Sequence, residues 1–380
     1  MAPSDLRVAL FSGNYSYVRD GANQSLNLLV GFLLAQGVKV RIYSPTVAEP
    51  AFPAVGDVVD VPAFPMFAGR GEYRVARGLP AAPRADLEAF APNIVHVSAP
   101  DLLGHAAVKW ARASGIVSVA SFHTRFETYF SYYRVGFAEP LIKRLMTRFY
   151  NRFDRVLVPS PSMIALLQEW GVAAPMSIWS RGIDHDRFRP DRRDRAWRRE
   201  VGIGDGEVVI GFLGRLVKEK GLDIFADVVT ELRRRGVPHR VLVVGEGPAR
   251  GWFAGQVPEA VFAGFQSGDD LGRAVASMDV FFNPSVTETF GNVTLEAMAA
   301  GVPVVAARAT GAVDLIDEGA TGFLVPPTDV AAYADAIARI VAEPALRARM
   351  GQAGTAKAAG YRWDGVNQAV LDAYLELTAR

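Results

Sequence analysis

Short apolar runs alternate with helical segments along almost the whole chain, and this alternation constrains the fold more than any other feature. Residues 6–11 form the first run; after a polar loop, residues 23–36 carry apolar side chains at helical spacing until Gly37. Further runs read VKVRIYSP, IVHVSAP and IVSVASFHT, and the helical stretch VKWARASG lies between the last two. This order is typical of a parallel sheet covered by helices.

The same order begins again at Val208. The second set of apolar runs reads VVIGFLGRL, RVLVVGEGP, AVFAGF, DVFFNPS, PVVAA and GFLVPP, with a helix expected over residues 222–235. A chain of 380 residues is longer than one typical domain. We therefore predict an α/β protein with two Rossmann-like, doubly wound domains.

The domain boundaries follow from where the two series stop and start. Residues 1–186 are assigned to the first domain and residues 187–360 to the second, and an amphipathic helix over residues 361–380 is expected to cross back to the first. The polar stretch 189–207 is interpreted as a linker with a short surface helix. Ligands bind at the carboxyl ends of parallel strands, so we expect an interdomain cleft that carries the site.

The composition argues against several classes of protein. Basic and acidic side chains number 41 and 40, so no net field favours nucleic acid. Cysteine is absent, and the five histidines show no His-x-x-x-His spacing, so we expect neither a thiol nucleophile nor a metal centre. The N-terminus lacks a signal-peptide pattern, and the longest apolar run, residues 28–35, is far shorter than the roughly 20 residues that span a bilayer. We expect a soluble intracellular protein.

The stretch GRLVKEKG follows the first strand of the second series. Gly214 lets the backbone turn, and Arg215 and Lys220 flank the start of the next helix. Two cations beside a helix N-terminus suit a diphosphate, because the helix amides and the side-chain charges act on the same anion. The alternative is that both cations are solvated surface charges.

The stretch SVTETFGNVTLEAMAAG, residues 285–301, predicts a second anion site. A helix is expected over residues 294–300, ended by Gly301, so the loop at its N-terminus would consist of Phe290, Gly291, Asn292 and Val293. Free amides point outward from such a loop, and a phosphate can approach the backbone closely at Gly291.

Two acids, Glu288 and Glu296, stand on either side of this loop. With an anion held between them, one carboxylate can accept hydrogen bonds from sugar hydroxyls and the other from a ribose, because carboxylates offer several acceptor sites to diols. The alternative for Glu296 is a first-turn acid that complements the helix dipole.

Together these motifs resemble one family. The Glu-x(7)-Glu arrangement with FGNV inside it, GRLVKEKG, VVGEGP and NPSVTETFG are similar to those of retaining GT-B glycosyltransferases of family 4, over nearly the whole chain. The resemblance implies two Rossmann-like domains and a UDP- or GDP-sugar donor bound mainly by the second. It also implies catalysis without a metal or another cofactor.

The resemblance assigns roles to individual residues. Arg215 and Lys220 would neutralise the donor diphosphate, which makes a metal unnecessary because fixed cations meet the developing charge. Glu288 would contact the hexose, residues 290–293 its hydroxyls and phosphates, and Glu296 the ribose. Gly245 to Gly247 and the stretch Ala263 to Phe265 would line the nucleoside, and Gly214 would belong to the donor-binding residues. In the first domain Gly21 matches the first glycine of a family Gly-Gly pair at the phosphates, whereas Ala22 replaces the second.

His123 follows a strand of the first domain, at the end where a reacting group belongs. The resemblance implies that a histidine here helps to orient the donor sugar through a hydrogen bond. The alternative is a structural hydrogen-bonding histidine.

Residues 139–153 predict a basic amphipathic helix. The apolar residues assigned to one face are Leu141, Ile142, Leu145, Met146, Phe149, Tyr150 and Phe153. The cations beside them are Lys143, Arg144, Arg148 and Arg152, and the aromatic residues that precede the helix include Tyr129 and Tyr133. We expect these cations and the two tyrosines to form an acceptor surface that docks on anionic lipid. The alternative is a core-facing helix with a solvated basic edge.

The run FHTRFETYFSYYRVGFAEPLIKRLM, followed by WSRGIDHDRF, resembles the sulfolipid-synthase and lipid-mannosyltransferase branch of the family. We therefore expect transfer of a hexose-type sugar to a membrane lipid, by an enzyme bound peripherally to the inner face of the cytoplasmic membrane. The absence of an obvious base suits a front-face mechanism, in which the departing phosphate takes the acceptor proton.

Other functions stay open at this stage. They are transfer to a soluble or polysaccharide acceptor, epimerisation of the nucleotide-sugar, and sugar-nucleotide binding without catalysis. A dehydrogenase is disfavoured, because VLVVGEGP has imperfect glycine spacing and no acid ends the next strand. The sequence leaves the sugar, the nucleotide, the linkage and the oligomeric state undetermined.

Overall fold

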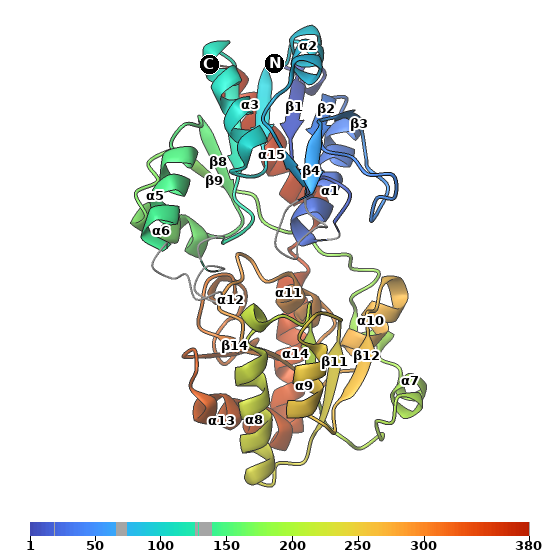
Figure 1. Cartoon of the computed structure of the whole chain (residues 1–380). Helices are drawn as coiled ribbons and strands as arrows, with labels where there is room; N and C mark the ends of the chain where they lie inside the picture. Colours follow the sequence, from blue (N-terminus) through green and yellow to red (C-terminus); the bar gives the residue numbers. More distant parts are fainter. Residues whose placement is uncertain (19, 66–73, 126–127, 129–138, 380) are drawn as a thin grey trace. The chain divides into compact units, whose positions relative to one another are not determined.

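The computed structural model describes residues 1–18, 20–65, 74–125, 128 and 139–379. They form two compact α/β units (Figure 1). The first takes its described residues from 1–127, 137–181 and 363–380, and the second from 128–136 and 182–362.

A seven-stranded parallel sheet forms the centre of the first unit, in the order β3-β2-β1-β6-β7-β8-β9. Its strands are β1 (Arg7–Phe11), β2 (Lys39–Ser44), β3 (Asp57–Asp60), β6 (Ile94–Val97), β7 (Val117–Ser121), β8 (Arg155–Val158) and β9 (Met176–Ile178). A separate antiparallel pair is formed by β4 (Ala63–Pro65) and β5 (Arg74–Ala76). The central strands are mostly apolar because helices cover both faces of the sheet, although β6 and β7 also bury His96, Ser118 and Ser121.

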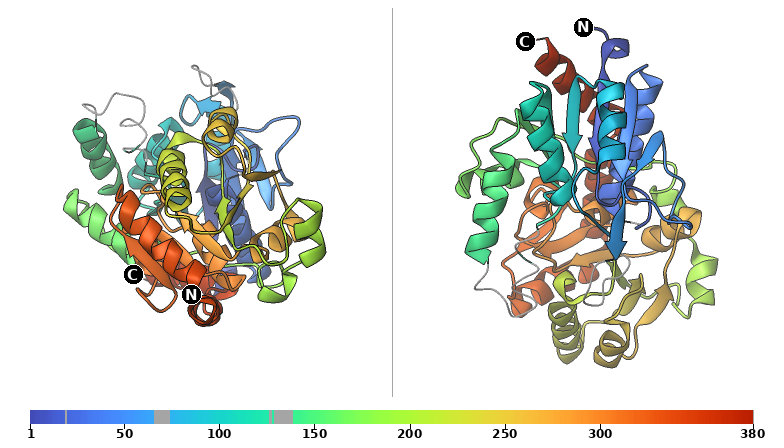
Figure 2. Two further views of the ribbon diagram at one scale, coloured as in Figure 1. Left: turned by 90° about the horizontal axis from the view of Figure 1, so that it is seen from below. Right: turned by 45° about the horizontal axis from the view of Figure 1, so that its top comes forward.

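Helices of the first unit pack on both faces of this sheet. They are η1 (Pro3–Asp5), α1 (Gly21–Ala35), α2 (Ala81–Phe90), α3 (Leu102–Ala113), α5 (Glu139–Tyr150), α6 (Pro161–Glu169) and α15 (Trp363–Thr378). Leu29 of α1 and Tyr374 of α15 share one core with Val8 of β1. Helix α15, in red, therefore lies beside α1, in blue, although it is the last helix of the chain (Figures 1 and 2).

The second unit contains a six-stranded parallel sheet in the order β12-β11-β10-β13-β14-β15. Its strands are β10 (Val209–Leu213), β11 (Arg240–Val244), β12 (Val261–Gly264), β13 (Val280–Asn283), β14 (Val304–Ala307) and β15 (Gly322–Val325). Each coincides with one of the apolar runs of the second series, so the predicted α/β class with two parallel sheets is confirmed.

The helices of the second unit again pack on both faces of its sheet. They are η3 (Pro190–Arg192), α7 (Arg195–Glu200), η4 (Lys218–Lys220), α8 (Leu222–Arg234), α9 (Arg250–Gln256), α10 (Gly268–Ala276), α11 (Asn292–Ala299), α12 (Ala312–Leu315), α13 (Val330–Ala342) and α14 (Pro344–Ala358). Phe225 of α8 and Ile337 of α13 pack on one face, and Met298 of α11 packs on the other.

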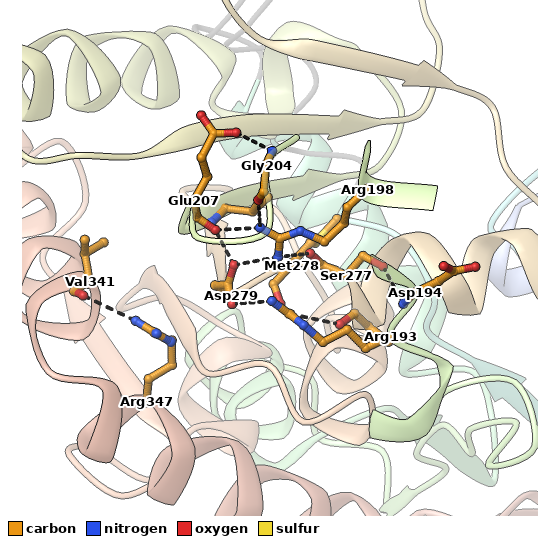
Figure 3. A network of polar contacts seen from close by, with 12 residues as sticks. Arg193, Asp194, Arg198, Gly204, Glu207, Ser277, Met278, Asp279, Val341 and Arg347 are labelled. Carbon is orange, nitrogen blue, oxygen red and sulfur yellow. Dashed lines mark hydrogen bonds and ion pairs between the residues drawn. The ribbon is translucent and has the colours of Figure 1, made fainter. Parts of the chain in front are cut away.

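The stretch that we interpreted as a polar linker, residues 189–207, is part of the second unit. Trp197 and Arg198 of α7 are both buried. The Arg198 guanidinium donates to the Asp279 carboxylate at 3.0 Å and to the carbonyl oxygens of Ser277, Gly204 and Glu207 (Figure 3). Arginine richness suggested a solvated segment, but one of these arginines anchors it to the start of β13.

None of the helices that the structure describes is both long enough and apolar enough to cross a membrane.

Candidate active site

Each sheet has one point at which the strand order reverses. In the first unit it lies between β1 and β6, and in the second between β10 and β13. Loops leave in opposite directions on the two sides of such a point, so the carboxyl ends of the strands there are the usual ligand site of an open α/β sheet. In the second unit the loops at this point are residues 214–221 after β10 and residues 284–291 after β13.

The two loops are joined by an ion pair. The Lys220 ammonium lies 2.5 Å from the Glu288 carboxylate, and both side chains are largely shielded from solvent, with 29% and 15% exposed. The sequence placed Lys220 at a phosphate and Glu288 at a sugar, but it did not predict that they touch. In this structure Lys220 and Glu288 form one ion pair at the reversal point.

Hydroxyl groups hold the same two loops together. Ser285 Oγ and Thr287 Oγ1 both donate to the Glu219 carbonyl, at 3.5 and 3.3 Å. A third loop, after β14, supports Glu288 from the other side, because Thr310 Oγ1 donates to the Glu288 carbonyl at 2.9 Å. Gly311 is required there, since a Cβ would lie 2.7 Å from the Phe290 carbonyl oxygen. Both the carboxylate and its backbone are thus fixed before any ligand arrives.

Arg215 is exposed and lies directly after Gly214 at the end of β10. The glycines of this region serve close packing between strand ends. A Cβ on Gly245 would lie 2.0 Å from the Gly214 carbonyl oxygen, and one on Gly247 would lie 2.4 Å from that of Leu216. The two glycines predicted to line the nucleoside therefore already have a structural reason to be glycine.

Phe265 follows β12 and is 62% exposed, one of the most exposed large apolar side chains in the described chain. This exposure leaves an aromatic face at the carboxyl end of the strand, and its contact with the nucleoside stays a prediction.

Helix α11 begins two residues earlier than the sequence predicted. Gly291 is its N-cap, with φ of 99°, and Asn292 and Val293 are the first helical residues rather than part of the loop. The positive φ lets the chain enter the helix directly after Gly291. Phe290 is buried and packs edge-on against Tyr361 at 5.9 Å, so only its backbone is left for a ligand.

This earlier start changes the interpretation of Glu296. The residue lies in the second turn of α11, and the first turn holds no acid, so the alternative of a first-turn acid is wrong. Glu296 is partly buried; the surrounding protein raises the pKa of its carboxyl to about 7, and Arg187 acts in the opposite direction. Arg187 is a neighbour that periodicity could not reveal, because it lies more than 100 residues away in the chain.

In the first unit His123 lies two residues after β7. Its Nδ1 atom lies 2.8 Å from the Arg181 guanidinium, and its ring meets the edge of Trp179 at 5.2 Å between centroids. Burial, with added effects of Arg181 and His96, holds the pKa of His123 well below its usual range. The sequence singled out Arg181 only as part of the domain crossover, and no spacing rule pointed to its contact with His123.

Gly21 is the first residue of α1. The helix is capped by Asp20, whose side chain accepts a hydrogen bond from the Asn23 amide at 2.8 Å. Gly21 therefore lies at a helix N-terminus, which is the setting expected of a phosphate contact.

Helix α5 presents a different face from the one predicted. Ile142, Met146, Phe149 and Tyr150 pack toward the core, but Leu141 and Leu145 are 58% and 53% exposed. Arg144 and Arg148 are exposed as well. The predicted single apolar face was wrong, because the apolar residues are too many for one side of a helix and two of them point outward.

The other predicted cations of this surface make contacts within the unit. Lys143 pairs with Glu139 at 2.7 Å, and the Arg152 guanidinium lies 3.3 Å from His105 Nδ1. Tyr129 and Tyr133 lie outside the described residues. Among the described residues, no group of three His, Asp or Glu side chains is arranged to hold a metal ion.

Two family models match the chain. One, described as Glycosyltransferase Family 4, matches residues 19–187, and one described as Glycosyl transferases group 1 matches residues 207–343. Each unit of the structure thus corresponds to one of the two models.

The relatives of this chain include three enzymes with different named activities. A GDP-mannose-dependent alpha-mannosyltransferase of Mycobacterium tuberculosis is 34% identical over 77% of this chain and 75% of its own length. The sulfoquinovosyl transferase SQD2 of Arabidopsis thaliana is 32% identical over 76% of this chain and 58% of its own. A D-inositol 3-phosphate glycosyltransferase of Saccharomonospora viridis is 35% identical over 60% of this chain and 56% of its own.

Solved structures resemble the fold over its full length. Sucrose-phosphate synthase of Thermosynechococcus elongatus has a TM-score of 0.78 at 20% identity and covers 98% of this chain and 99% of its own. The Anabaena protein HepE, solved with UDP and glucose, has a TM-score of 0.75 at 19% identity and covers 97% of this chain and 99% of its own. At these identities the likeness concerns the fold.

Proposed function

The chain belongs to glycosyltransferase family 4 and is a glycosyltransferase of the GT-B fold, and from this premise we propose a donor, an acceptor and a mechanism. The enzyme transfers a hexose-type sugar, with retention of configuration, from a nucleoside diphosphate sugar to a lipid at a membrane surface. The observation that carries the proposal is the Lys220–Glu288 pair, held at the reversal point of the second sheet beside Arg215.

The pair suits a donor in which a diphosphate adjoins a sugar. Lysine carries three donor hydrogens, so Lys220 can stay bonded to Glu288 and still donate to a phosphate oxygen. Glu288 keeps acceptor sites for sugar hydroxyls. When the bond between the sugar C1 and the phosphate oxygen breaks, Lys220 and Arg215 meet the charge that develops on the phosphate. We propose that these cations make a metal ion unnecessary.

The nucleotide of the donor is proposed from the relatives. Their names include a GDP-mannose-dependent enzyme, which favours GDP-mannose as the first donor to test, with UDP-sugars as the alternative. The test is calorimetric titration of the chain with GDP-mannose, GDP, UDP-glucose and UDP, with and without EDTA. We expect one nucleotide class to bind equally with and without the chelator. Loss of binding in EDTA would refute metal independence, and no binding of either class would refute the donor site.

The acceptor is proposed from the outer stripe of α5. Leu141, Arg144, Leu145 and Arg148 follow one another at intervals of three, one and three residues, so they lie on one exposed side of the helix. A stripe of leucines and arginines fits the interface of an anionic membrane, where the apolar groups enter the headgroup region and the cations meet lipid charge. The enzyme would then work on a lipid from the inner face of the cytoplasmic membrane.

Sedimentation with vesicles tests this docking surface. Each arginine near an anionic surface contributes about 1 kcal/mol, so the loss of two costs about 2 kcal/mol, or roughly thirtyfold in binding. We expect Arg144→Glu with Arg148→Glu to lose at least this much on vesicles with anionic lipid, while donor hydrolysis is unchanged.

A matched control has the same change in net charge on the other unit. Arg233→Glu with Arg234→Glu alters the last turn of α8, and we expect it to bind vesicles as the unmodified protein does. Equal binding of the α5 variant and the control would show that α5 is not the docking surface.

Transfer to a soluble acceptor is the second candidate, and the relative named as a D-inositol 3-phosphate glycosyltransferase favours it. The two are separated by supplying the labelled donor with either a phospholipid in vesicles or a soluble inositol phosphate. Label that moves only to the soluble compound would replace the lipid acceptor. Conversion of the donor without any acceptor would point to an epimerase.

A further inference from the structure

His123 lies in a buried cluster whose parts come from distant segments of the first unit. Arg181 and Trp179 follow β9, at the edge of the sheet, and His123 follows β7. Arg181 is only 4% exposed and Trp179 only 1%. The imidazole therefore lies between an aromatic ring edge and a buried guanidinium.

The contact between the two side chains fixes the proton of the imidazole. A guanidinium has five N–H donors and no acceptor, and burial lowers the pKa of Arg181 only to about 10, so it stays charged at neutral pH. The Arg181 Nη2 atom lies 2.8 Å from His123 Nδ1. Nδ1 must accept this hydrogen bond, and a neutral imidazole then carries its proton on Nε2.

Arg181 is itself held in place. Its Nη1 atom donates to the carbonyl oxygens of Trp179 and Ser180, at 3.0 and 2.9 Å, and its Cζ atom lies 5.2 Å from the centre of the Trp179 ring. The Trp179 indole lies 3.4 Å from the side chain of Asn367 on α15, which in turn reaches the Leu28 carbonyl of α1. The guanidinium is thus positioned by backbone, ring and two helices before a substrate binds.

We propose that Arg181 is a positioning residue that keeps His123 in the Nε2-protonated tautomer, so that His123 acts in the transfer as a neutral hydrogen-bond donor and not as a base. This inference rests on the proposed function for the transfer reaction in which His123 takes part. With Nδ1 occupied by Arg181 and Nε2 protonated, the ring can offer one hydrogen bond and cannot take up the acceptor proton.

The tautomer can be measured without any substrate. The chain has five histidines, so a nitrogen-correlated NMR spectrum of the histidine-labelled protein is simple, and the His123 signals are those that disappear in His123→Asn. We expect His123 to be protonated at Nε2 alone and not to titrate between roughly pH 5 and 8, where an ordinary histidine does. A proton on Nδ1, or a charged ring near neutral pH, would overturn the inference.

Kinetics tests whether Arg181 acts through His123. We expect Arg181→Met to lower kcat by about 10- to 100-fold, the range seen when a metal-bound histidine loses the hydrogen-bond partner that orients it. Arg181→Lys, which restores a cation able only to donate, should recover a large part of kcat. His123→Ala with Arg181→Met should be no worse than His123→Ala alone.

A purely structural role predicts another pattern. The losses of the two single variants would then multiply in the double variant, and the His123 signals of Arg181→Met would match those of the unmodified protein; either result overturns the inference. If Arg181→Met does not fold, Arg181→Lys and the NMR spectrum of the unmodified protein still test the inference. If no donor supports transfer, the proposed function fails, but the spectrum still tests the tautomer.

Discussion

Removal of the Asp279 carboxylate should destabilise the second unit more than any change of a surface acid. Asp279 accepts hydrogen bonds from Arg198 at 3.0 Å, from Arg193 at 2.8 Å and from the Val209 amide at 2.9 Å (Figure 3). These contacts join the segment before β10 to the start of β10 and β13. The variant Asp279→Ala removes both carboxylate oxygens and so all three hydrogen bonds at once.

The size of the effect follows from the burial of Arg198. Its side chain is 1% exposed and that of Asp279 is 11% exposed, so the variant leaves a buried cation without its counter-ion. Breaking a buried ion pair by removal of one partner costs about 3–5 kcal/mol. Because Arg198 keeps three carbonyl partners, we expect the lower end, about 3 kcal/mol, or roughly a 150-fold change in the unfolding equilibrium.

The assay must report on the second unit alone, because a chain of two units need not unfold in one step. Hydrogen exchange of peptides from α7 and β10, read by mass spectrometry, meets this requirement. We expect their protection to fall by about two orders of magnitude in Asp279→Ala, and peptides of β1 and α1 to stay as they were.

A control lies on the same helix. Arg199, next to Arg198, pairs with Asp205 on the surface, and both are exposed. Asp205→Ala should leave the exchange of β10 unchanged, because exposed pairs contribute little. A similar loss in both variants, or no loss in Asp279→Ala, would refute the argument that burial of Arg198 sets the magnitude. Adding Arg198→Met to Asp279→Ala should recover stability, since the unpaired charge is then gone.

Three further predictions concern the donor site. Lys220→Ala and Glu288→Ala should each lower turnover by about 10² to 10³ while the protein still folds, and near-normal turnover in both would remove the pair from the site. Donor affinity should fall as the pH is lowered through about 7, because the Glu296 carboxyl has a pKa raised to about 7 and must be ionised to accept hydrogen bonds from a ribose diol. Titration of Glu296→Gln should show no such fall. The same fall in that variant would exclude Glu296 as its source. Gly247→Ala should lower the unfolding temperature, because the added Cβ would lie 2.4 Å from a backbone oxygen. Gly251→Ala in α9 should leave the unfolding temperature unchanged, because no atom lies within 4 Å of the added Cβ. Equal effects of the two variants would contradict the packing argument.

The strands could be predicted from the sequence because a strand that is buried on both faces consists mainly of consecutive apolar residues. A run such as VALF in β1 or VLVV in β11 is apolar without interruption, and its end marks where a ligand residue can stand. His123 and Arg215 were predicted as site residues in this way, from their places after a strand, and Glu288 was predicted from its place before the loop 290–293. Such runs do not indicate which loops contact each other. The contacts of Lys220 with Glu288 and of Arg181 with His123 join residues 68 and 58 positions apart, and only the strand order brings them together.

Helix faces were harder to predict for a related physical reason. Over residues 139–153 seven apolar positions were assigned to one side of a helix, although the core takes only part of them. Periodicity shows that a helix has an apolar side, but the width of the buried stripe depends on the neighbours that cover it. The arginines of 189–207 show the reverse case, because a guanidinium with four partners can be buried, and composition alone cannot distinguish it from a solvated one.

The proposed state of His123 also bears on the route of the acceptor proton. A retaining transfer forms a bond from the acceptor oxygen to the sugar C1 and releases one proton from the hydroxyl. If Arg181 occupies Nδ1 and Nε2 is protonated, His123 cannot take that proton. In the proposed mechanism the departing phosphate oxygen gains negative charge at the same moment and can take the proton, and Lys220 and Arg215 would stabilise that charge. Replacing Lys220 should therefore slow proton transfer as well as departure of the nucleotide, and a solvent isotope effect on kcat that grows in Lys220→Ala would reveal it. A solvent isotope effect that appears only in Arg181→Met would instead indicate that His123 takes the acceptor proton.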